Sequence, residues 1–391
     1  MTPFSFNTAR FIRQEFGAAK HFGDIFHDYI TPDVAAGPVM FITDPGVLKL
    51  GLADAAMASL KDAGVELVLF SDVVADPPEA VVLNAAEKAK TAGIKVVIGF
   101  GGGSSMDVAK LIAFLASSDQ SLDEIYGVGM AKGTRLPLIL VPTTAGTGSE
   151  VTAVSIVTTG ESEKKGVVSP IILPDLALLD AELTLGLPPH ITAATGIDAM
   201  VHAIEAYTST NANNNPISAM LARQALSLMG GSIETAVFEG GNAEARTNML
   251  LGAMFAGQAF ANSPVAAVHA LAYPVGGIFH VPHGLSNSLV LPHVMRFNAS
   301  ACALQYAELA PYVFADIDTA RSAQTVSAEF IERLAALTEK LGLQTRLSQM
   351  GIADTDLDRL TDDAMKQTRL LVNNPREVTY QDAHDIYRAA L

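Results

Sequence analysis

The chain has 391 residues, of which 49% are hydrophobic and only 17% are charged, and it carries a formal net charge of −16. This length exceeds what one hydrophobic core usually supports, so we expect two domains, and the apolar excess favours a homodimer or a higher homo-oligomer. The negative charge, without any cluster of basic residues, argues against nucleic acid and anionic membrane surfaces as partners.

The N-terminal segment MTPFSFNTARFIRQEFG lacks the apolar core and the cleavage site of a secretory signal. Cys302 is the only cysteine, which excludes an intramolecular disulfide and a thiolate-clustered metal site. Both observations predict a cytoplasmic protein.

The first half of the chain alternates short aliphatic runs with amphipathic segments. We predict strands at 39–43, 66–70 and 95–100, and helices at 46–64 and 78–93. This alternation is typical of a parallel sheet flanked by helices. Further strands are expected at 137–141 and 153–159.

Asp44 closes the first predicted strand. There, a carboxylate could accept hydrogen bonds from ribose hydroxyls and repel a ribose phosphate, which favours NAD over NADP. A simple turn aspartate before Pro45 is the alternative.

The strand at 95–100 runs into the glycine-rich turn GGGSS, residues 101–105, and then into a helix at 106–114. Glycines allow close backbone approach to an anion, and the helix N-terminus stabilises its charge. Ser104 or Ser105 is expected to cap the helix. The spacing is not the G-x-G-x-x-G fingerprint, and an ordinary tight turn is the alternative.

A second donor-rich loop, PTTAGTGSE at 142–150, follows the strand at 137–141. Its hydroxyls and backbone amides suit a pyrophosphate and a ribose, although such a loop can also cap its own backbone. Two such loops at the carboxyl ends of strands favour a nucleotide site.

The turn-rich stretch LGLPPH, residues 185–190, marks the expected boundary between a domain at 1–187 and a domain at 188–391. Beyond it, helical periods at 191–209, 216–239, 243–261 and 325–341 predict a mostly helical second half. Within the first of these, Asp198 and His202 are four residues apart, so they share one helix face. Alone, this pair is more often a hydrogen-bonded surface contact than a metal site.

His269 and His283 lie in a stretch without Asp, Glu, Lys or Arg that extends from Arg246 to Arg296. Polar residues, prolines and glycines divide this stretch into pieces too short to span a membrane. Histidines buried there need a partner, and one carboxylate with three imidazoles suits a divalent iron, zinc, cobalt or nickel ion. Such a set, with one position left for substrate, is typical of a catalytic site.

His280 and His293 are the alternative ligands, which we assign to packing or supporting contacts.

Four motifs in order make the chain resemble the iron-containing (group III) alcohol dehydrogenases over essentially its full length. They are GGGSSMDVAK (101–110), PTTAGTGSEVT (142–152), GIDAMVHAIEAY (196–207) and HALAYPVGGIFHVPHG (269–284). The resemblance implies an N-terminal α/β nucleotide-binding domain, an all-α C-terminal domain and an active site in the cleft between them. It also implies hydride transfer between a short-chain alcohol or aldehyde and NAD, with Fe²⁺ as the expected metal and Zn²⁺ as the alternative.

Carried over by position, the family's site residues fall into three groups. The metal ligands are Asp198, His202, His269 and His283. The cofactor contacts are Asp44, Gly102, Gly103, Ser104, Asp107, Thr143, Thr144, Thr147 and Lys165. Phe260 matches a position that lines the nicotinamide and substrate pocket in similar enzymes.

Two positions depart from many relatives. Tyr273 stands where they have histidine, which leaves the proton route open: Tyr273 or His280 could relay the proton to water, and packing is the alternative role of Tyr273. Asp76 stands where they have asparagine beside the cofactor.

The tyrosine at position 273 also resembles hydroxy-acid dehydrogenases and hydroxyacid–oxoacid transhydrogenases, which form the alternative function. The lack of Arg and Lys near the metal motifs favours a neutral substrate, and a non-catalytic nucleotide-binding protein is the remote alternative.

Overall fold

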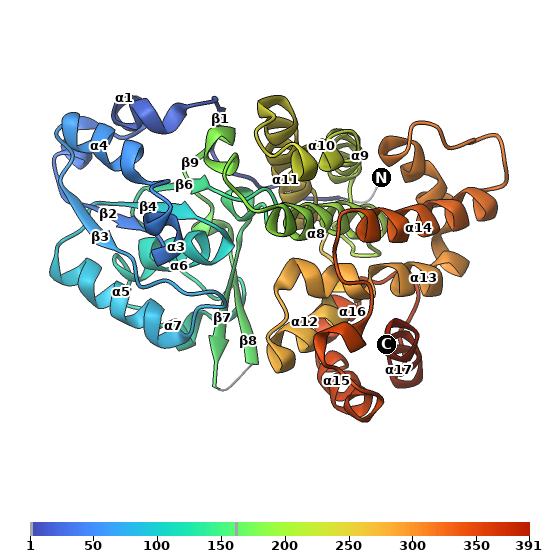
Figure 1. The fold of residues 1–391 in the computed structure, drawn as a ribbon. Helices are drawn as coiled ribbons and strands as arrows, with labels where there is room; N and C mark the ends of the chain where they lie inside the picture. Colours follow the sequence, from blue (N-terminus) through green and yellow to red (C-terminus); the bar gives the residue numbers. More distant parts are fainter. Residues whose placement is uncertain (1–2, 161–162) are drawn as a thin grey trace. The chain divides into compact units, whose positions relative to one another are not determined.

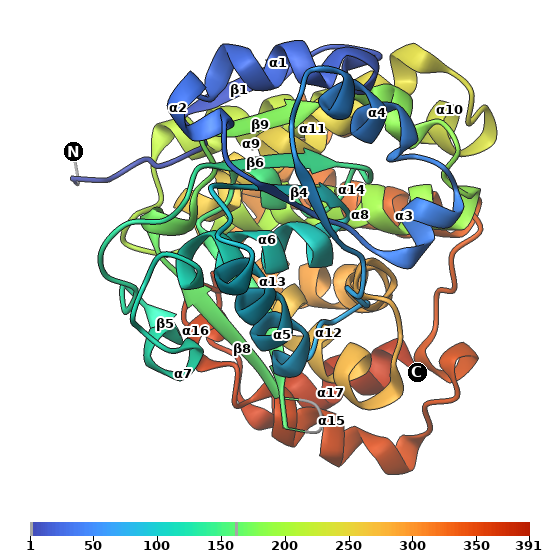
Figure 2. The same ribbon diagram turned by 90° about the vertical axis from the view of Figure 1, so that its left-hand side faces the viewer.

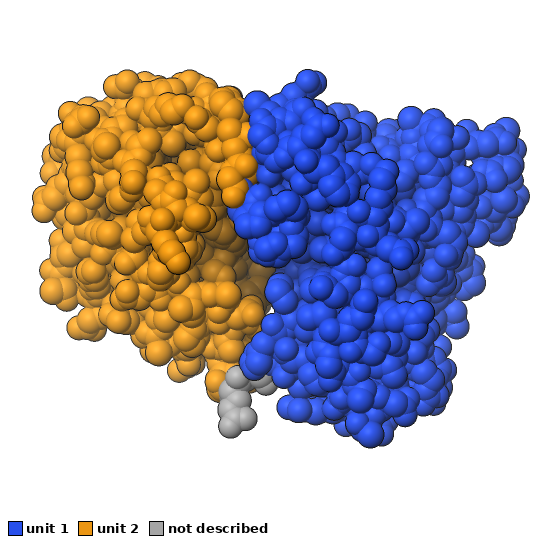
Figure 3. Space-filling model, viewed as in Figure 1, with its two compact units in different colours: residues 1–6, 145–147, 187–391 blue, residues 7–144, 148–186 orange. Residues whose placement is uncertain are grey.

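The computed structural model describes residues 3–160 and 163–391. They form two compact units, which Figure 3 distinguishes by colour. The α/β unit comprises residues 7–144 and 148–186, and the helical unit comprises residues 3–6, 145–147 and 187–391, as far as the chain is described. The main change of unit, between residues 186 and 187, lies beside the boundary expected from the LGLPPH stretch.

The α/β unit contains a six-stranded parallel sheet with the order β1-β9-β6-β4-β2-β3 (Figure 1). Its strands are β1 (Phe11–Gln14), β2 (Val39–Ile42), β3 (Leu67–Phe70), β4 (Val96–Gly101), β6 (Leu138–Pro142) and β9 (Leu176–Leu179). The helices of this unit are α1 (Phe22–Tyr29), α2 (Pro32–Ala35), α3 (Pro45–Lys49), α4 (Asp54–Asp62), α5 (Glu79–Thr91), α6 (Gly103–Leu115) and α7 (Leu122–Ile125).

Both faces of this sheet are covered, which explains why its central strands are continuously apolar. Successive side chains of a strand point to opposite faces, so Phe41 of β2 packs into one core and Met40 into the other. The core around Phe41 includes side chains of α1 and α4, and the core around Met40 includes those of α5 and α6. Figures 1 and 2 show these helix pairs on opposite sides of the sheet. The predicted parallel sheet flanked by helices is confirmed.

The structure differs from the sequence prediction in three respects in this unit. β7 (Val154–Thr159) does not join the main sheet; it pairs antiparallel with β8 (Glu163–Val168) in a small sheet with β5 (Gly127–Val128). The single helix expected at 46–64 is two helices, because Gly51 adopts a positive φ of 68° between α3 and α4. The main sheet also contains β1 and β9, which were not predicted as strands.

The described part of the helical unit contains helices and no strand, which confirms the predicted helical second half. The helices are α8 (Pro189–Thr208), α9 (Pro216–Gly230), α10 (Ile233–Phe238), α11 (Ala243–Asn262), α12 (Ala267–Phe279), α13 (His283–Val313), α14 (Ala323–Lys340), α15 (Leu357–Ala364), α16 (Thr368–Leu371) and α17 (Tyr380–Ala390). α8 packs against α9, α11 and α13, so it is the central helix of this unit. Within the described residues, none of the helices is both long and apolar enough to cross a membrane.

Candidate active site

Three helices of the helical unit bring the predicted metal ligands together. Asp198 and His202 lie one turn apart on α8, and both are buried because neighbouring helices surround α8. His269 lies in the first turn of α12, and His283 is the first residue of α13.

Close packing of α13 on α8 depends on the residue that follows His283. A Cβ atom on Gly284 would lie 2.4 Å from the carbonyl oxygen of Ala194 and 3.3 Å from Cβ of Asp198. Any larger residue would therefore push the start of α13 away from α8.

The four side chains form a compact cluster. One ligand atom from each of Asp198, His202, His269 and His283 lies within 4.8 Å of the others. Oδ1 of Asp198 is 3.6 Å from Nε2 of His283 and 3.9 Å from Nε2 of His269. Three of the residues are buried, whereas the side chain of His283 is 42% exposed, so the cluster has an accessible side.

The electrostatics of the cluster suit a divalent cation. Burial lowers the pKa of His202 to about 3, so its imidazole is neutral at physiological pH, and its Nδ1 is a buried atom without a hydrogen-bond partner among the described residues. Burial alone would raise the pKa of Asp198, but the nearby histidines, His283 foremost, and the Asn287 amide lower it overall. A carboxylate and three imidazoles fit iron or zinc.

Two further polar residues, which we did not identify from the sequence, contact the ligands. Asn287 donates from Nδ2 to Oδ1 of Asp198 at 2.6 Å, and the same nitrogen is 3.3 Å from Nε2 of both His269 and His283. Glu205 contacts the other ring nitrogen of His269. Their spacing could have identified both residues from the sequence. Asn287 follows His283 by four residues and Glu205 follows Asp198 by seven, and residues at these spacings lie on the same face of a helix.

Aromatic rings adjoin the cluster. The ring of Phe260 on α11 stacks on His202 at a centroid distance of 4.3 Å, and the ring of Tyr273 on α12 lies 6.0 Å from that of His283. The predicted residues Phe260 and Tyr273 are therefore beside the ligands, within the helical unit.

The other two histidines considered from the sequence lie outside the cluster. His280 ends α12 in a left-handed conformation, with φ of 56°, and is exposed. His293 lies on α13, where burial lowers its pKa to about 4. Neither belongs to the group of four ligand atoms.

In the α/β unit, the predicted nucleotide-binding segments meet at one edge of the sheet. β2, β4 and β6 are neighbours, and their carboxyl ends carry Asp44, the glycine-rich turn and the donor-rich loop. Asp44 accepts hydrogen bonds from Ser105 Oγ at 3.3 Å and from the backbone nitrogen of Val47 at 3.0 Å. The backbone nitrogen of Thr143 donates to the Gly101 carbonyl oxygen at 3.0 Å.

The helix after the glycine-rich turn begins earlier than the sequence suggested. Gly102 is the N-cap of α6, and no side chain caps it, so the predicted cap by Ser104 or Ser105 is wrong. The chain instead enters the helix through Gly101, whose φ of 152° and closeness to Ser105 require glycine. The first helical turn of α6 therefore comes directly after the glycine-rich turn, and its backbone amides, including those of Gly103 and Ser104, have no acceptor within the helix.

Asp107 has an internal role that the resemblance did not imply. Its carboxylate accepts from Ser149 Oγ at 2.6 Å and from the backbone nitrogen of Ile156 at 3.0 Å. The fully buried ammonium of Lys110 donates to Ser149 Oγ at 2.7 Å and to the Val154 carbonyl oxygen at 2.7 Å. Together these residues tie the donor-rich loop and β7 to α6.

The remaining predicted cofactor residues are more dispersed. Thr144 lies beside the glycine-rich turn, because a Cβ on Gly102 would be 3.8 Å from its Oγ1. Asp76 is exposed and forms an ion pair with Lys164 at 2.6 Å, whereas the Lys165 ammonium lies 5.5 Å from the centre of the Tyr126 ring. Thr147 belongs to the helical unit.

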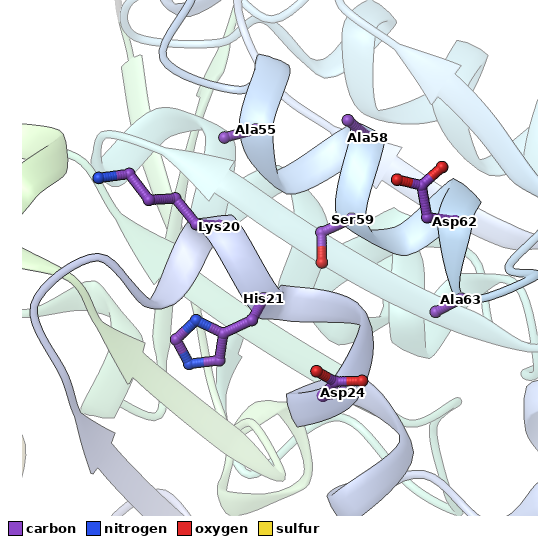
Figure 4. A pocket seen from close by; sticks show the side chains of 8 residues that line it. All are labelled: Lys20, His21, Asp24, Ala55, Ala58, Ser59, Asp62 and Ala63. Atoms are coloured by element: carbon purple, nitrogen blue, oxygen red, sulfur yellow. The ribbon is translucent and has the colours of Figure 1, made fainter.

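A separate surface hollow lies in the α/β unit, between the segment Ala18–Tyr29 and α4 (Figure 4). Lys20, Asp24 and Asp62 give its walls charges of both signs, and His21 and alanines form much of the remainder. None of the predicted site residues lines it, so we assign it no function.

Comparison with known proteins agrees with this architecture. Residues 9–181 match the family described as iron-containing alcohol dehydrogenase, and residues 192–391 match the C-terminal domain of the Fe-containing alcohol dehydrogenase family. The chain is 39% identical, over 381 residues, to long-chain-alcohol dehydrogenase 1 of Geobacillus thermodenitrificans, covering 96% of this chain and 95% of the relative.

Two solved structures illustrate the likeness in fold. A 1,3-propanediol oxidoreductase superposes with a TM-score of 0.94 at 30% identity, covering 100% of both chains. Sulfoacetaldehyde reductase from Bifidobacterium kashiwanohense, solved in complex with NAD⁺, superposes with a TM-score of 0.85 at 29% identity, covering 100% of this chain and 99% of that one. The chain therefore belongs to the iron-containing alcohol dehydrogenase family.

Proposed function

We propose that this protein is a metal-dependent alcohol dehydrogenase that transfers a hydride between a neutral alcohol or aldehyde and NAD. The observation that carries the proposal is the buried cluster of one carboxylate and three imidazoles, with its accessible side at His283. Family membership and the names of the relatives, which include a long-chain-alcohol dehydrogenase and a 1,3-propanediol oxidoreductase, support it. The hydroxy-acid alternative is not favoured by these relatives.

We assign Asp198, His202, His269 and His283 as the residues that hold the metal, with Fe²⁺ as the expected ion. When bound, the ion supplies positive charge that favours loss of the alcohol proton, and the nicotinamide accepts the hydride. The buried His202 presents a neutral imidazole, and Asp198 supplies one negative charge. Phe260 stacks on His202 and covers one face of its ring.

For the cofactor, we propose that Asp44 and the first turn of α6 receive the dinucleotide. Gly102, Gly103 and Ser104 would offer backbone amides to its phosphates, with Thr143, Thr144 and Thr147 as hydroxyl donors. Asp76, Asp107 and Lys165 remain proposals from the resemblance. Of these, Asp107 is committed to contacts within the protein.

The direct test is to measure reduced-cofactor absorbance with purified, iron-loaded protein and a panel of substrates. The panel contains primary alcohols of increasing length, a diol, and an anionic alcohol as a charged comparison. We expect NAD-dependent oxidation of neutral alcohols that stops when a chelator removes the metal. Turnover of only the anionic alcohol, or turnover that survives metal removal, would contradict the proposal.

Replacing Asp44 by glycine is expected to relax the choice between NAD and NADP. The substitution removes an acceptor for ribose hydroxyls and the repulsion toward a 2′-phosphate, while glycine remains tolerated as the N-cap of α3. The preference for NAD, measured as the ratio of kcat/KM values, should fall by about 1–3 kcal/mol. A wild-type enzyme that already uses NADP as well as NAD would show that Asp44 does not select the cofactor.

Replacing Tyr273 by phenylalanine tests the proton route. The ring next to His283 is kept and only the hydroxyl is lost, so a relay role predicts a fall in turnover of roughly 10²-fold or more. Tyr207→Phe is the matched control, because the Tyr207 hydroxyl donates to the exposed Glu308. Near-native turnover of Tyr273→Phe across the pH range would assign Tyr273 to packing and leave His280 and solvent as the routes.

We further propose that the protein works in the cytoplasm as a homodimer or higher homo-oligomer. Its high apolar content and its single, buried cysteine support this. Neither nucleic acid nor a membrane is an expected partner.

A further inference from the structure

The structure shows a buried carboxylate behind the metal ligands. Glu205 lies on α8, and its side chain is 5% exposed. Its Oε2 atom is 2.6 Å from Nδ1 of His269, and its Oε1 atom accepts from the backbone nitrogen of Val268 at 2.7 Å. Both carboxylate oxygens are thus engaged by the first turn of α12.

The contact with Glu205 determines which nitrogen of His269 carries the proton. A carboxylate only accepts hydrogen bonds, so Nδ1 must be the protonated nitrogen, and in a neutral imidazole Nε2 then keeps its lone pair. Nε2 is the atom that faces the cluster, 3.9 Å from Oδ1 of Asp198. The tautomer set by Glu205 is therefore the one that a metal ligand requires.

The contact with Val268 fixes the backbone that carries this ring. The N-cap of α12, Ala266, provides no side-chain hydrogen bond, so the amides of the first turn need acceptors from elsewhere. Glu205 supplies one, and its negative charge also suits the positive end of the helix. A single carboxylate therefore holds both the start of α12 and the orientation of His269.

Glu205 can do this because of where it lies on α8. Asp198, His202 and Glu205 are spaced by four and then three residues, so they share one face of the helix. The stretch that contains His269 has no acidic residue of its own between Arg246 and Arg296. A carboxylate acceptor for His269 therefore has to come from another segment, here α8.

We propose that Glu205 is a positioning residue for the metal site: it fixes the tautomer and orientation of His269 so that Nε2 is available to the ion. This rests on the proposed metal site. Outer partners of ligating histidines typically contribute 10- to 100-fold to metal affinity, so we expect a loss of about that size without Glu205.

The test compares Glu205→Gln with Glu308→Gln in the full chain. Glutamine keeps the shape, but one of its two terminal atoms is an NH₂ donor, so it cannot accept at both positions that face the His269 ring and the Val268 amide. Glu308 is a suitable control because it is an exposed carboxylate that accepts a hydrogen bond from Tyr207. The dissociation constant for Zn²⁺ is measured by competition with a chromophoric chelator, without turnover.

We expect the dissociation constant to rise by roughly 10- to 100-fold in Glu205→Gln and to stay unchanged in Glu308→Gln. An unchanged affinity in Glu205→Gln would overturn the proposal. Failure of the wild-type chain to bind Zn²⁺ would instead overturn the proposed metal site.

A second measurement avoids any dependence on how the variant folds. In the wild-type protein loaded with Zn²⁺ and labelled with ¹⁵N-histidine, the ring nitrogen shifts of His269 report its tautomer. We expect a protonated Nδ1, hydrogen-bonded to Glu205. A protonated Nε2 would show that Glu205 does not position His269 for the ion.

Discussion

Bound metal and turnover are expected to be lost in both His269→Ala and His283→Ala, while the fold is retained. Each variant removes one of the four clustered ligands, and three remaining ligands leave the ion exposed to exchange with water. Alanine is well tolerated in helices, so α12 and α13 should persist. Metal content by elemental analysis, turnover with NAD, and circular dichroism check the three parts of this expectation.

The control for this pair is His280→Ala. His280 is exposed at the end of α12 and outside the cluster, so this variant should keep its metal whatever happens to its rate. A metal-free His280→Ala protein would mean that the ligand set is wrong. Full activity in His269→Ala or in His283→Ala would equally contradict the assignment.

Lys110→Met should strongly destabilise the α/β unit. The Lys110 ammonium is fully buried, and it donates to Ser149 Oγ, Thr152 Oγ1 and the Val154 carbonyl oxygen at 2.7–3.0 Å. Methionine fills a similar volume but leaves these acceptors and the nearby Asp107 carboxylate without their cation. Breaking a buried charged pair in this way typically costs about 3–5 kcal/mol.

Urea-induced unfolding measures this loss, with Lys20→Met as the matched control. Lys20 forms an exposed ion pair with Glu182, for which only a small effect is expected. Because Lys110 holds the donor-rich loop, we also expect Lys110→Met to bind NAD more weakly than the wild-type protein in the absence of urea. Equal stability of Lys110→Met and Lys20→Met would show that the buried contacts of Lys110 contribute little.

Local sequence patterns determined the elements that carry most of the candidate site. The aliphatic runs that became β2, β4 and β6 each end in a polar or glycine-rich segment, so the positions of Asp44 and of both loops could be predicted. The four-residue spacing of Asp198 and His202 placed them on one face of a helix, and α8 confirms that they share it. These inferences succeed because periodicity acts over a few residues of the same element.

The tertiary structure decided what lies between elements that are distant in the sequence. Glu205 meets His269 across 64 residues, and Lys110 meets Ser149 across 39, so no local period contains either contact. β7 has the alternation of a strand, but this alternation does not say which strand it pairs with, and in the folded chain β7 pairs antiparallel with β8, the next strand along the chain, and not with the main sheet. β1 and β9 are as short as the predicted β2 and β3, and their place in the main sheet depends on tertiary pairing, because β9 lies between β1 and β6.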